Sequence, residues 1–150
     1  MAVYRSALAQ TRRAFSLMLM EYLEGPERSV DCLAHQGELV AAVARLKHGR
    51  HQSLETSGAA IEGARRLVER YRLDGIVNIQ FRDTRGIPHL LEINARMAGG
   101  MLYSCAALNL PYWSAMLALG LAQPHDVPAP REGLRVAPIG SALTLTNEAS

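Results

Sequence analysis

Three oxygen-bearing side chains in the second half of the chain, Gln80, Glu92 and Asn94, have the chemistry of magnesium ligands. Glu92 and Asn94 are two residues apart, so in an extended strand both project from the same side. Magnesium accepts carboxylate and amide oxygens and keeps waters and substrate phosphates as its other ligands. The same residues would also suit the solvated side of an amphipathic sheet, so spacing alone leaves both interpretations open.

Residues that suit an anion follow directly after Asn94. Arg96 offers a planar cation that matches phosphate oxygens, and the Gly99-Gly100 pair lets backbone N–H groups come close to an anion. A double glycine alone is more often a simple turn. Together with the oxygen ligands, these residues favour a metal and phosphate site over a solvated surface.

A β-hairpin is expected to position these side chains. Residues 76–82 and 87–94 read as two strands whose connection suits a three-residue loop with Asp83 paired to Ile87. This register places Asn78 opposite Glu92 and Gln80 opposite Leu90. One face of the hairpin would then carry Ile76, Asn78, Gln80, Arg82, Leu90, Glu92 and Asn94, and the other would carry Val77, Ile79, Phe81, Leu91 and Ile93. The apolar face is expected to pack into the core, which leaves the polar face for a site.

The order of elements along the chain indicates the fold class. Hydrophobic periodicity and turn residues predict a helix over 4–15, strands over 16–23, 28–34 and 39–47, a polar loop over 49–55, helices over 57–72 and 111–121, a proline-rich linker over 124–130 and a last strand over 134–146. Because hairpins connect most strands, we expect an α+β fold with a mostly antiparallel sheet packed with helices. The sequence contains neither GxGxxG nor GxxxxGK[ST], so a nucleotide would have to be held in another way.

Composition narrows the classes of protein. With 150 residues, 49% hydrophobic and 20% charged, the chain is expected to form a single domain over residues 1–150. Its apolar runs are shorter than the roughly 20 residues of a membrane span, and the sequence opens without a signal pattern, so a cytoplasmic protein without membrane contact is expected. The net charge of +2 comes from scattered basic residues and does not require nucleic acid. Cys32 and Cys105 lack metal-binding spacing and are expected to be reduced packing residues.

The segment from Gly75 to Gly100, GIVNIQFRDTRGIPHLLEINARMAGG, resembles the signature of ATP-grasp enzymes. It is most similar to the large-subunit type of carbamoyl-phosphate synthetase, in which N-[IV]-Q-F is followed by E-[IV]-N-x-R. The resemblance implies that Gln80, Glu92 and Asn94 bind the Mg²⁺ or Mn²⁺ ions that bridge the phosphates of ATP. It also implies that Arg96 has a catalytic role beside the phosphates and the acyl phosphate being made.

A second segment, MLMEYLEGPERSVDCL from Met18 to Leu33, is similar to the part of the same family that lines the adenine pocket. By this resemblance the backbone around Glu21 and Leu23 hydrogen-bonds adenine, and Glu27 accepts from the ribose hydroxyls. A solvated residue after a turn is the alternative for Glu27. Lys47, or else Arg45, falls where many members place a cation near the terminal phosphate or the substrate, although a surface lysine at a strand end is common.

The resemblance covers residues 17–120 and implies the C-terminal subdomain of an ATP-grasp fold. The family's nucleotide-binding N-terminal half has no counterpart in this sequence, so a partner chain or further sequence is expected to supply it, and the isolated chain is expected to be inactive. The implied function is ATP and Mg²⁺ binding in a ligase that activates a small-molecule carboxylate as an acyl phosphate for attack by an amine or thiol. The alternatives are a non-catalytic or degenerate nucleotide-binding module and a non-nucleotide interaction domain; a homodimer is a further expectation.

Overall fold

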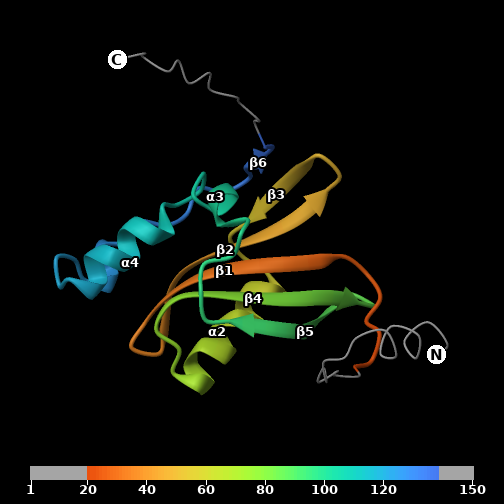
Figure 1. Cartoon of the computed structure of the whole chain (residues 1–150), viewed down its shortest axis with the longest axis horizontal. Helices are drawn as coiled ribbons and strands as arrows, with labels where there is room; N and C mark the ends of the chain where they lie inside the picture. Colours follow the sequence, from red (N-terminus) through yellow and green to blue (C-terminus); the bar gives the residue numbers. More distant parts are fainter. Residues whose placement is uncertain (1–19, 139–150) are drawn as a thin grey trace, which may run out of the picture.

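The structure of residues 20–138, a computed structural model, is built on one antiparallel sheet with the strand order β5-β4-β1-β2-β3-β6 (Figure 1). The strands are β1 (Glu27–His35), β2 (Glu38–His48), β3 (His51–Glu55), β4 (Gly75–Thr84), β5 (Ile87–Asn94) and β6 (Arg135–Val136). The helices are α2 (Ala59–Tyr71), α3 (Met101–Ser104) and α4 (Leu110–Ala118), followed by the 3₁₀ turn η1 (Pro124–Asp126). The α+β class with a mostly antiparallel sheet is therefore confirmed.

Two tight turns bring the four strands that carry the candidate site together. β1 and β2 are joined through Gln36 and Gly37, and β4 and β5 through Arg85 and Gly86, and all four turn residues have positive φ. Turns with two left-handed residues match the twist of antiparallel strands, which explains why glycine occupies the second position of each. β1 lies between β2 and β4, so side chains from three strands meet on each face of the sheet.

One face of the sheet packs against α2. Alternate residues of β1 and β4 project toward this helix, and its apolar stripe covers them. The resulting core contains Val30, Cys32, Ala34, Ala42, Ala44, Ile61, Ala64, Val68, Val77, Ile79 and Phe81. The predicted core role of Val77, Ile79 and Phe81 is confirmed, and Ile93 packs against the same cluster.

The opposite face is covered by the chain that follows β5. Residues 95–100 cross over β4 and β1 to reach α3, and α4 then packs against β1 and β4 (Figure 1). Leu33 and Ile76 from the sheet contact Leu110 and Leu117 at the α4 end of this face. Val43, Leu54 and Ala107 form a second apolar cluster on this face, and most of its remaining residues are polar.

Several predicted boundaries are wrong or lie outside the described residues. The predicted loop over 49–55 contains β3, because residues 51–55 pair with 44–48 of β2. The predicted strand over 16–23 is not formed in its described part, residues 20–23. The predicted helix over 4–15 lies outside the described residues. Of the predicted last strand over 134–146, the described part forms only the two-residue β6, which pairs with β3.

The remaining helical segments agree closely with the sequence. The predicted helices over 57–72 and 111–121 correspond to α2 and α4, and the proline-rich linker over 124–130 contains η1. Asn109 caps α4, accepting from the Tyr112 N–H at 3.1 Å, and Pro111 occupies the first turn, where a missing N–H costs little. Within residues 20–138, no helix is long and apolar enough to cross a membrane.

Candidate metal and phosphate site

The β4–β5 hairpin has a different register from the predicted one. Thr84 pairs with Ile87 around a two-residue turn, so the loop is one residue shorter than predicted. A bulge at Leu91 then shifts the register by one more residue, so that Gln80 pairs with Glu92 and Asn78 pairs with Asn94. The predicted pairs of Asn78 with Glu92 and Gln80 with Leu90 are therefore wrong.

The predicted division of the hairpin into two faces nevertheless survives at the site. A shift of one residue moves a side chain to the opposite face, and a second shift returns it. Glu92 and Asn94 lie beyond both shifts, so they share a face with Gln80 and Asn78. Leu90 lies between the two shifts and pairs with Phe81, so its predicted place on the polar face is wrong.

A cluster of side-chain oxygens that could bind a metal ion lies at the edge of the sheet and comes from Gln80, Glu92 and Asn94. Glu92 is exposed, whereas Gln80 and Asn94 are half-buried. Asn94 Nδ2 donates to Glu92 Oε1 at 2.7 Å, and Gln80 Nε2 donates to Asn78 Oδ1 at 3.3 Å. Both amide nitrogens are thereby engaged, which leaves the amide oxygens as acceptors. One carboxylate with two neutral oxygens fits a magnesium ion that takes its other ligands from waters and phosphates.

Next to this cluster, on the same face of the sheet, lies a buried polar network that the sequence did not reveal. Asp31 is fully buried, and its Oδ2 accepts from Arg45 Nε at 2.8 Å and from Ser104 Oγ at 2.6 Å. Its Oδ1 accepts from Asn78 Nδ2 at 2.8 Å. Asn78 Nδ2 and Arg45 Nη2 also donate to Ser29 Oγ, at 2.9 and 2.8 Å. We call these five residues, Ser29, Asp31, Arg45, Asn78 and Ser104, the Asp31 network.

The Asp31 network joins three strands and a helix through charged groups that are almost entirely buried. Arg45 is only 9% exposed, and its Nη1 also reaches Gln52 Oε1 at 3.4 Å. Burying a carboxylate and a guanidinium is costly unless they are paired and hydrogen-bonded, and here each charge is. Each buried side-chain nitrogen and oxygen atom in the described residues has a hydrogen-bond partner. The buried polar groups on this face are therefore all hydrogen-bonded.

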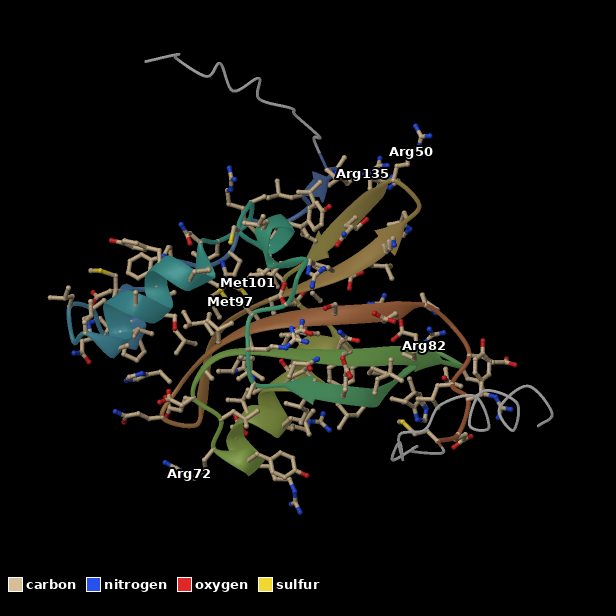
Figure 2. The ribbon with its side chains drawn as sticks, in the orientation of Figure 1. Arg50, Arg72, Arg82, Met97, Met101 and Arg135 are labelled. Atoms are coloured by element: carbon tan, nitrogen blue, oxygen red, sulfur yellow. The ribbon has the colours of Figure 1, made fainter. Side chains whose placement is uncertain are left out.

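Arg96 lies on the segment, residues 95–100, that runs from β5 across the sheet to α3. Its side chain is exposed, with Nη1 donating to Met97 O at 3.1 Å, and its backbone N–H donates to Asn94 O at 2.8 Å. Figure 2 shows Met97 on the crossing segment and Met101 at the start of α3. Gly100 lies so close to Arg45 that a Cβ there would be 2.2 Å from Nη1. Close packing on the network thus explains one of the two glycines.

Both residues predicted as the cation near the terminal phosphate, Lys47 and Arg45, lie on this face. Arg45 and Lys47 alternate with inward residues of β2 and share the polar face. The Arg45 guanidinium is hydrogen-bonded to Asp31 and Ser29, whereas Lys47 is exposed. Of the two predicted candidates, Lys47 is the one whose charge is open to a ligand.

Of the predicted adenine and ribose residues, Glu27 is the first residue of β1, whereas Glu21 and Leu23 precede the strand. Glu27 shares the polar face and lies opposite Arg82, whose Nη2 is 3.8 Å from Glu27 Oε2. The preceding segment is fastened to β4, because Thr84 Oγ1 donates to Glu24 O at 2.8 Å and Asp83 N donates to Pro26 O at 3.0 Å.

Glu21 and Leu23 come just before the residues that are bonded to β4. Glu21 lines a groove of about 660 Å³ together with Tyr22, Glu24, Gly25, Thr84, Arg85, Ile87 and His89. Leu23 is half-buried and is not among the residues that line this groove. The structure thus brings Glu27 onto the face of Gln80 and Glu92 and places Glu21 beside the tip of the β4–β5 hairpin.

The two cysteines take no part in this site. Cys32 is buried on the α2 side of the sheet, and burial, with a smaller contribution from the Asp31 charge, raises the pKa of its thiol. Cys105 is half-buried, and burial again makes the largest contribution to its raised pKa. Both are free thiols, as expected, and a protonated thiol is a poor nucleophile.

The fold defines an α+β domain with a polar face on its antiparallel sheet, and comparison with known proteins assigns its family. The chain belongs to the family described as "ATP-grasp in the biosynthetic pathway with Ter operon", whose model matches residues 13–142. The predicted membership of the ATP-grasp superfamily is thereby confirmed.

Two known proteins show how far the similarity extends. Carnosine synthase 1 of Mus musculus is 32% identical over 125 residues, which cover 71% of this chain and 15% of the synthase. An L-amino acid ligase from Bacillus licheniformis is similar in structure with a TM-score of 0.44 and 16% identity, over 56% of this chain and 25% of the ligase. The chain therefore spans only a small part of the length of either protein.

Proposed function

We propose that this chain binds Mg-ATP on its polar sheet face and forms the nucleotide-binding portion of an ATP-dependent ligase that activates a small carboxylate as an acyl phosphate. The observation that supports this proposal is the shared face of Gln80, Glu92 and Asn94, whose free oxygens suit a magnesium ion that bridges phosphates. Membership of the ATP-grasp family supports the choice of ATP as the nucleotide.

Each residue has a distinct role in this proposal. Glu92 supplies the single negative charge of the metal site, and the amide oxygens of Gln80 and Asn94 complete its protein ligands. A bound magnesium ion would neutralise phosphate charge, which is its usual contribution to phosphoryl transfer. Arg96, exposed on the crossing segment, would bind the transferred phosphoryl group and the acyl phosphate. Catalysis would rest on positioning and electrostatics rather than on a side-chain nucleophile.

The remaining predicted residues would hold the nucleoside and the terminal phosphate. The backbone around Glu21 and Leu23 would bind adenine, and Glu27 would accept from the ribose hydroxyls. Lys47 would contact the terminal phosphate or the carboxylate substrate, because its charge is exposed on the same face. The likeness to the carbamoyl-phosphate synthetase large subunit concerns these residues of the site and leaves the acid and the nucleophile undefined.

The name of carnosine synthase 1 supports a bond-forming reaction for the parent of this domain. Because the chain matches only 15% of that synthase, the substrates of the synthase are not transferred to this protein. An ATP-grasp half supplied by further sequence or a partner chain would complete the nucleotide clamp, and ligase activity would require it.

Replacement of Glu92 tests the proposal on the chain itself. In the wild type, millimolar Mg-ATP should shift the NMR side-chain amide signals of Gln80 and Asn94, and Glu92→Ala should weaken apparent affinity about tenfold or more. Glu69→Ala, which removes an exposed glutamate from α2, is the matched control and should leave the titration unchanged. Absence of any wild-type shift would favour a non-nucleotide interaction domain, and a Glu92→Ala titration equal to the wild type would refute the metal assignment.

A further inference from the structure

The Asp31 network lies beside the proposed metal site on the same face of the sheet, and its two ends lead to different parts of that site. One end runs through Asn78 to Gln80 on β4, and the other runs through Ser104 to α3. Both meet at a single buried carboxylate, Asp31, on the strand between β2 and β4. The arrangement of these contacts raises the question of what Asp31 holds in place.

The first end fixes the orientation of an amide. Asn78 Nδ2 donates to Asp31 Oδ1 at 2.8 Å, so the Asn78 Oδ1 atom must face the other way. That oxygen accepts from Gln80 Nε2 at 3.3 Å. Because the nitrogen of Gln80 is held by Asn78, its oxygen is the atom left for the face that also carries Glu92. Asp31 thus determines which end of the Gln80 amide can meet a cation.

The second end fastens the segment that carries Arg96. Residues 95–100 leave β5 at Asn94 and have no strand partner until α3 begins, and α3 has only four residues. Ser104, fully buried at the end of α3, donates to Asp31 Oδ2 at 2.6 Å. Gly100 meanwhile rests against the guanidinium that neutralises Asp31. The segment is therefore held at Asn94 on one side and by the Asp31–Arg45 pair on the other.

We propose that Asp31 is a positioning residue, which holds the Gln80 oxygen outward through Asn78 and holds the Arg96 segment over the sheet through Ser104. Arg45, whose Nε lies 2.8 Å from Asp31 Oδ2, supplies the opposite charge beside this buried carboxylate. The part of this inference that concerns metal affinity rests on the proposed function, whereas the part that concerns the Arg96 segment does not.

The test uses the full chain and a substitution that leaves the Asp31–Arg45 pair intact. Ser104→Ala removes only the hydroxyl that joins α3 to Asp31, whereas Asp31→Asn would leave a buried cation without its counter-charge and risks unfolding. Ser114→Ala on α4 is the matched control, since its hydroxyl makes no side-chain hydrogen bond within residues 20–138. Hydrogen exchange and titration with Mn²⁺-ATP are measured on the wild type, Ser104→Ala and Ser114→Ala, and Asn78→Ala is added for the titration.

Amide hydrogen exchange reports on the segment that carries Arg96 and does not depend on any ligand. In Ser104→Ala the amides of Arg96, Met101 and Tyr103, which are bonded within or next to the segment, should exchange about tenfold faster than in the wild type. Strand amides such as Ile79 should be unchanged. Equal protection of the segment in Ser104→Ala and wild type would overturn the second role of Asp31, whether or not ATP binds.

Titration with Mn²⁺-ATP separates positioning from a merely structural role. Asn78→Ala removes the oxygen that accepts from Gln80 Nε2 and should weaken the affinity of the folded protein for Mn²⁺-ATP about tenfold. Ser104→Ala should also weaken this affinity, whereas Ser114→Ala should leave it unchanged. Variants that lose only melting temperature and keep wild-type affinity would overturn the first role. Faster exchange of residues 95–104 in Ser104→Ala than in the wild type, with neither protein binding Mn²⁺-ATP, would refute the proposed function while supporting the positioning of the segment.

Discussion

Removing the guanidinium of Arg45 should cost more stability than any other single change of an arginine on the polar face. In Arg45→Met a side chain of similar length remains, but Asp31 keeps a buried charge with no cation beside it. Breaking a buried ion pair from one side costs about 3–5 kcal/mol, because the remaining charge stays desolvated. Ser29 and Gln52 each lose a donor as well. We expect a loss of about 3–5 kcal/mol in the free energy of unfolding.

Urea denaturation followed by Trp113 fluorescence and circular dichroism measures this loss. Trp113 is the only tryptophan and packs against the apolar cluster under α4, so its emission reports on tertiary packing. Arg65→Met is the matched control: its Nε lies 3.6 Å from Glu62 Oε2 on the exposed surface of α2. An exposed pair of this kind contributes at most about 0.5 kcal/mol.

The double variant Asp31→Asn with Arg45→Met completes a cycle that isolates the pair. Because neither charge then remains, its loss should fall short of the sum of the two single losses by about 2–3 kcal/mol. A loss below about 1 kcal/mol for Arg45→Met, or additive losses in the cycle, would refute the reasoning, because either result is typical of a solvated pair.

Two further predictions concern the crossing segment and the β2–β3 hairpin. Gly100→Ala should destabilise the chain by about 1–3 kcal/mol in the same urea assay, because its Cβ would meet Arg45, whereas Gly99→Ala has open space and should change stability by less than about 0.5 kcal/mol. Equal losses would show that the segment does not pack on Arg45. The pKa of His51 is lowered by desolvation and then by the charges of Arg135 and His48, so in an NMR titration Arg135→Gln should raise it; an unchanged pKa would contradict the 2.8 Å contact between Arg135 and His51.

The lowered pKa of His51 also sets the direction in which its contribution to stability changes with pH. A histidine whose pKa is lowered in the folded state binds fewer protons there than in the unfolded chain. Any stabilisation is therefore present above the ordinary pKa of 6.5 and is lost as pH falls through the folded-state value. Figure 2 shows Arg50 and Arg135 near the outer end of this hairpin, where added positive charge would be least tolerated.

The sequence predicted correctly that Gln80, Glu92 and Asn94 share one face, but it predicted their register and the face of Leu90 incorrectly, and the reason is local. Alternation of polar and apolar residues along β4 assigns the two faces, because one face must enter the core against α2. The same alternation cannot distinguish a three-residue loop from a two-residue turn followed by a bulge at Leu91. Both arrangements place Glu92 and Asn94 on one side, so the candidate site was predictable although its pairs were not.

The Asp31 network could not be predicted because its members are far apart in the sequence. Asp31 and Arg45 meet through the pairing of β1 with β2, and Ser104 arrives only after the chain has crossed the sheet. A hint was present in the sequence: Asp31 lies between Val30 and Cys32 in an otherwise apolar stretch of β1, where a carboxylate needs a buried partner. The identity of that partner depends on tertiary structure.

The measurement that tests the proposed site most directly is paramagnetic relaxation by Mn²⁺-ATP on the isotopically labelled chain. Manganese can replace magnesium among oxygen ligands and broadens the signals of nearby nuclei. Broadening should be strongest at the side-chain amides of Gln80 and Asn94 and at the backbone of Glu92, and weak along α2 on the opposite face. Broadening centred instead on residues 57–60, where a hollow of about 290 Å³ lies beside Arg28, or its absence throughout the chain, would contradict a metal–nucleotide site on the polar face.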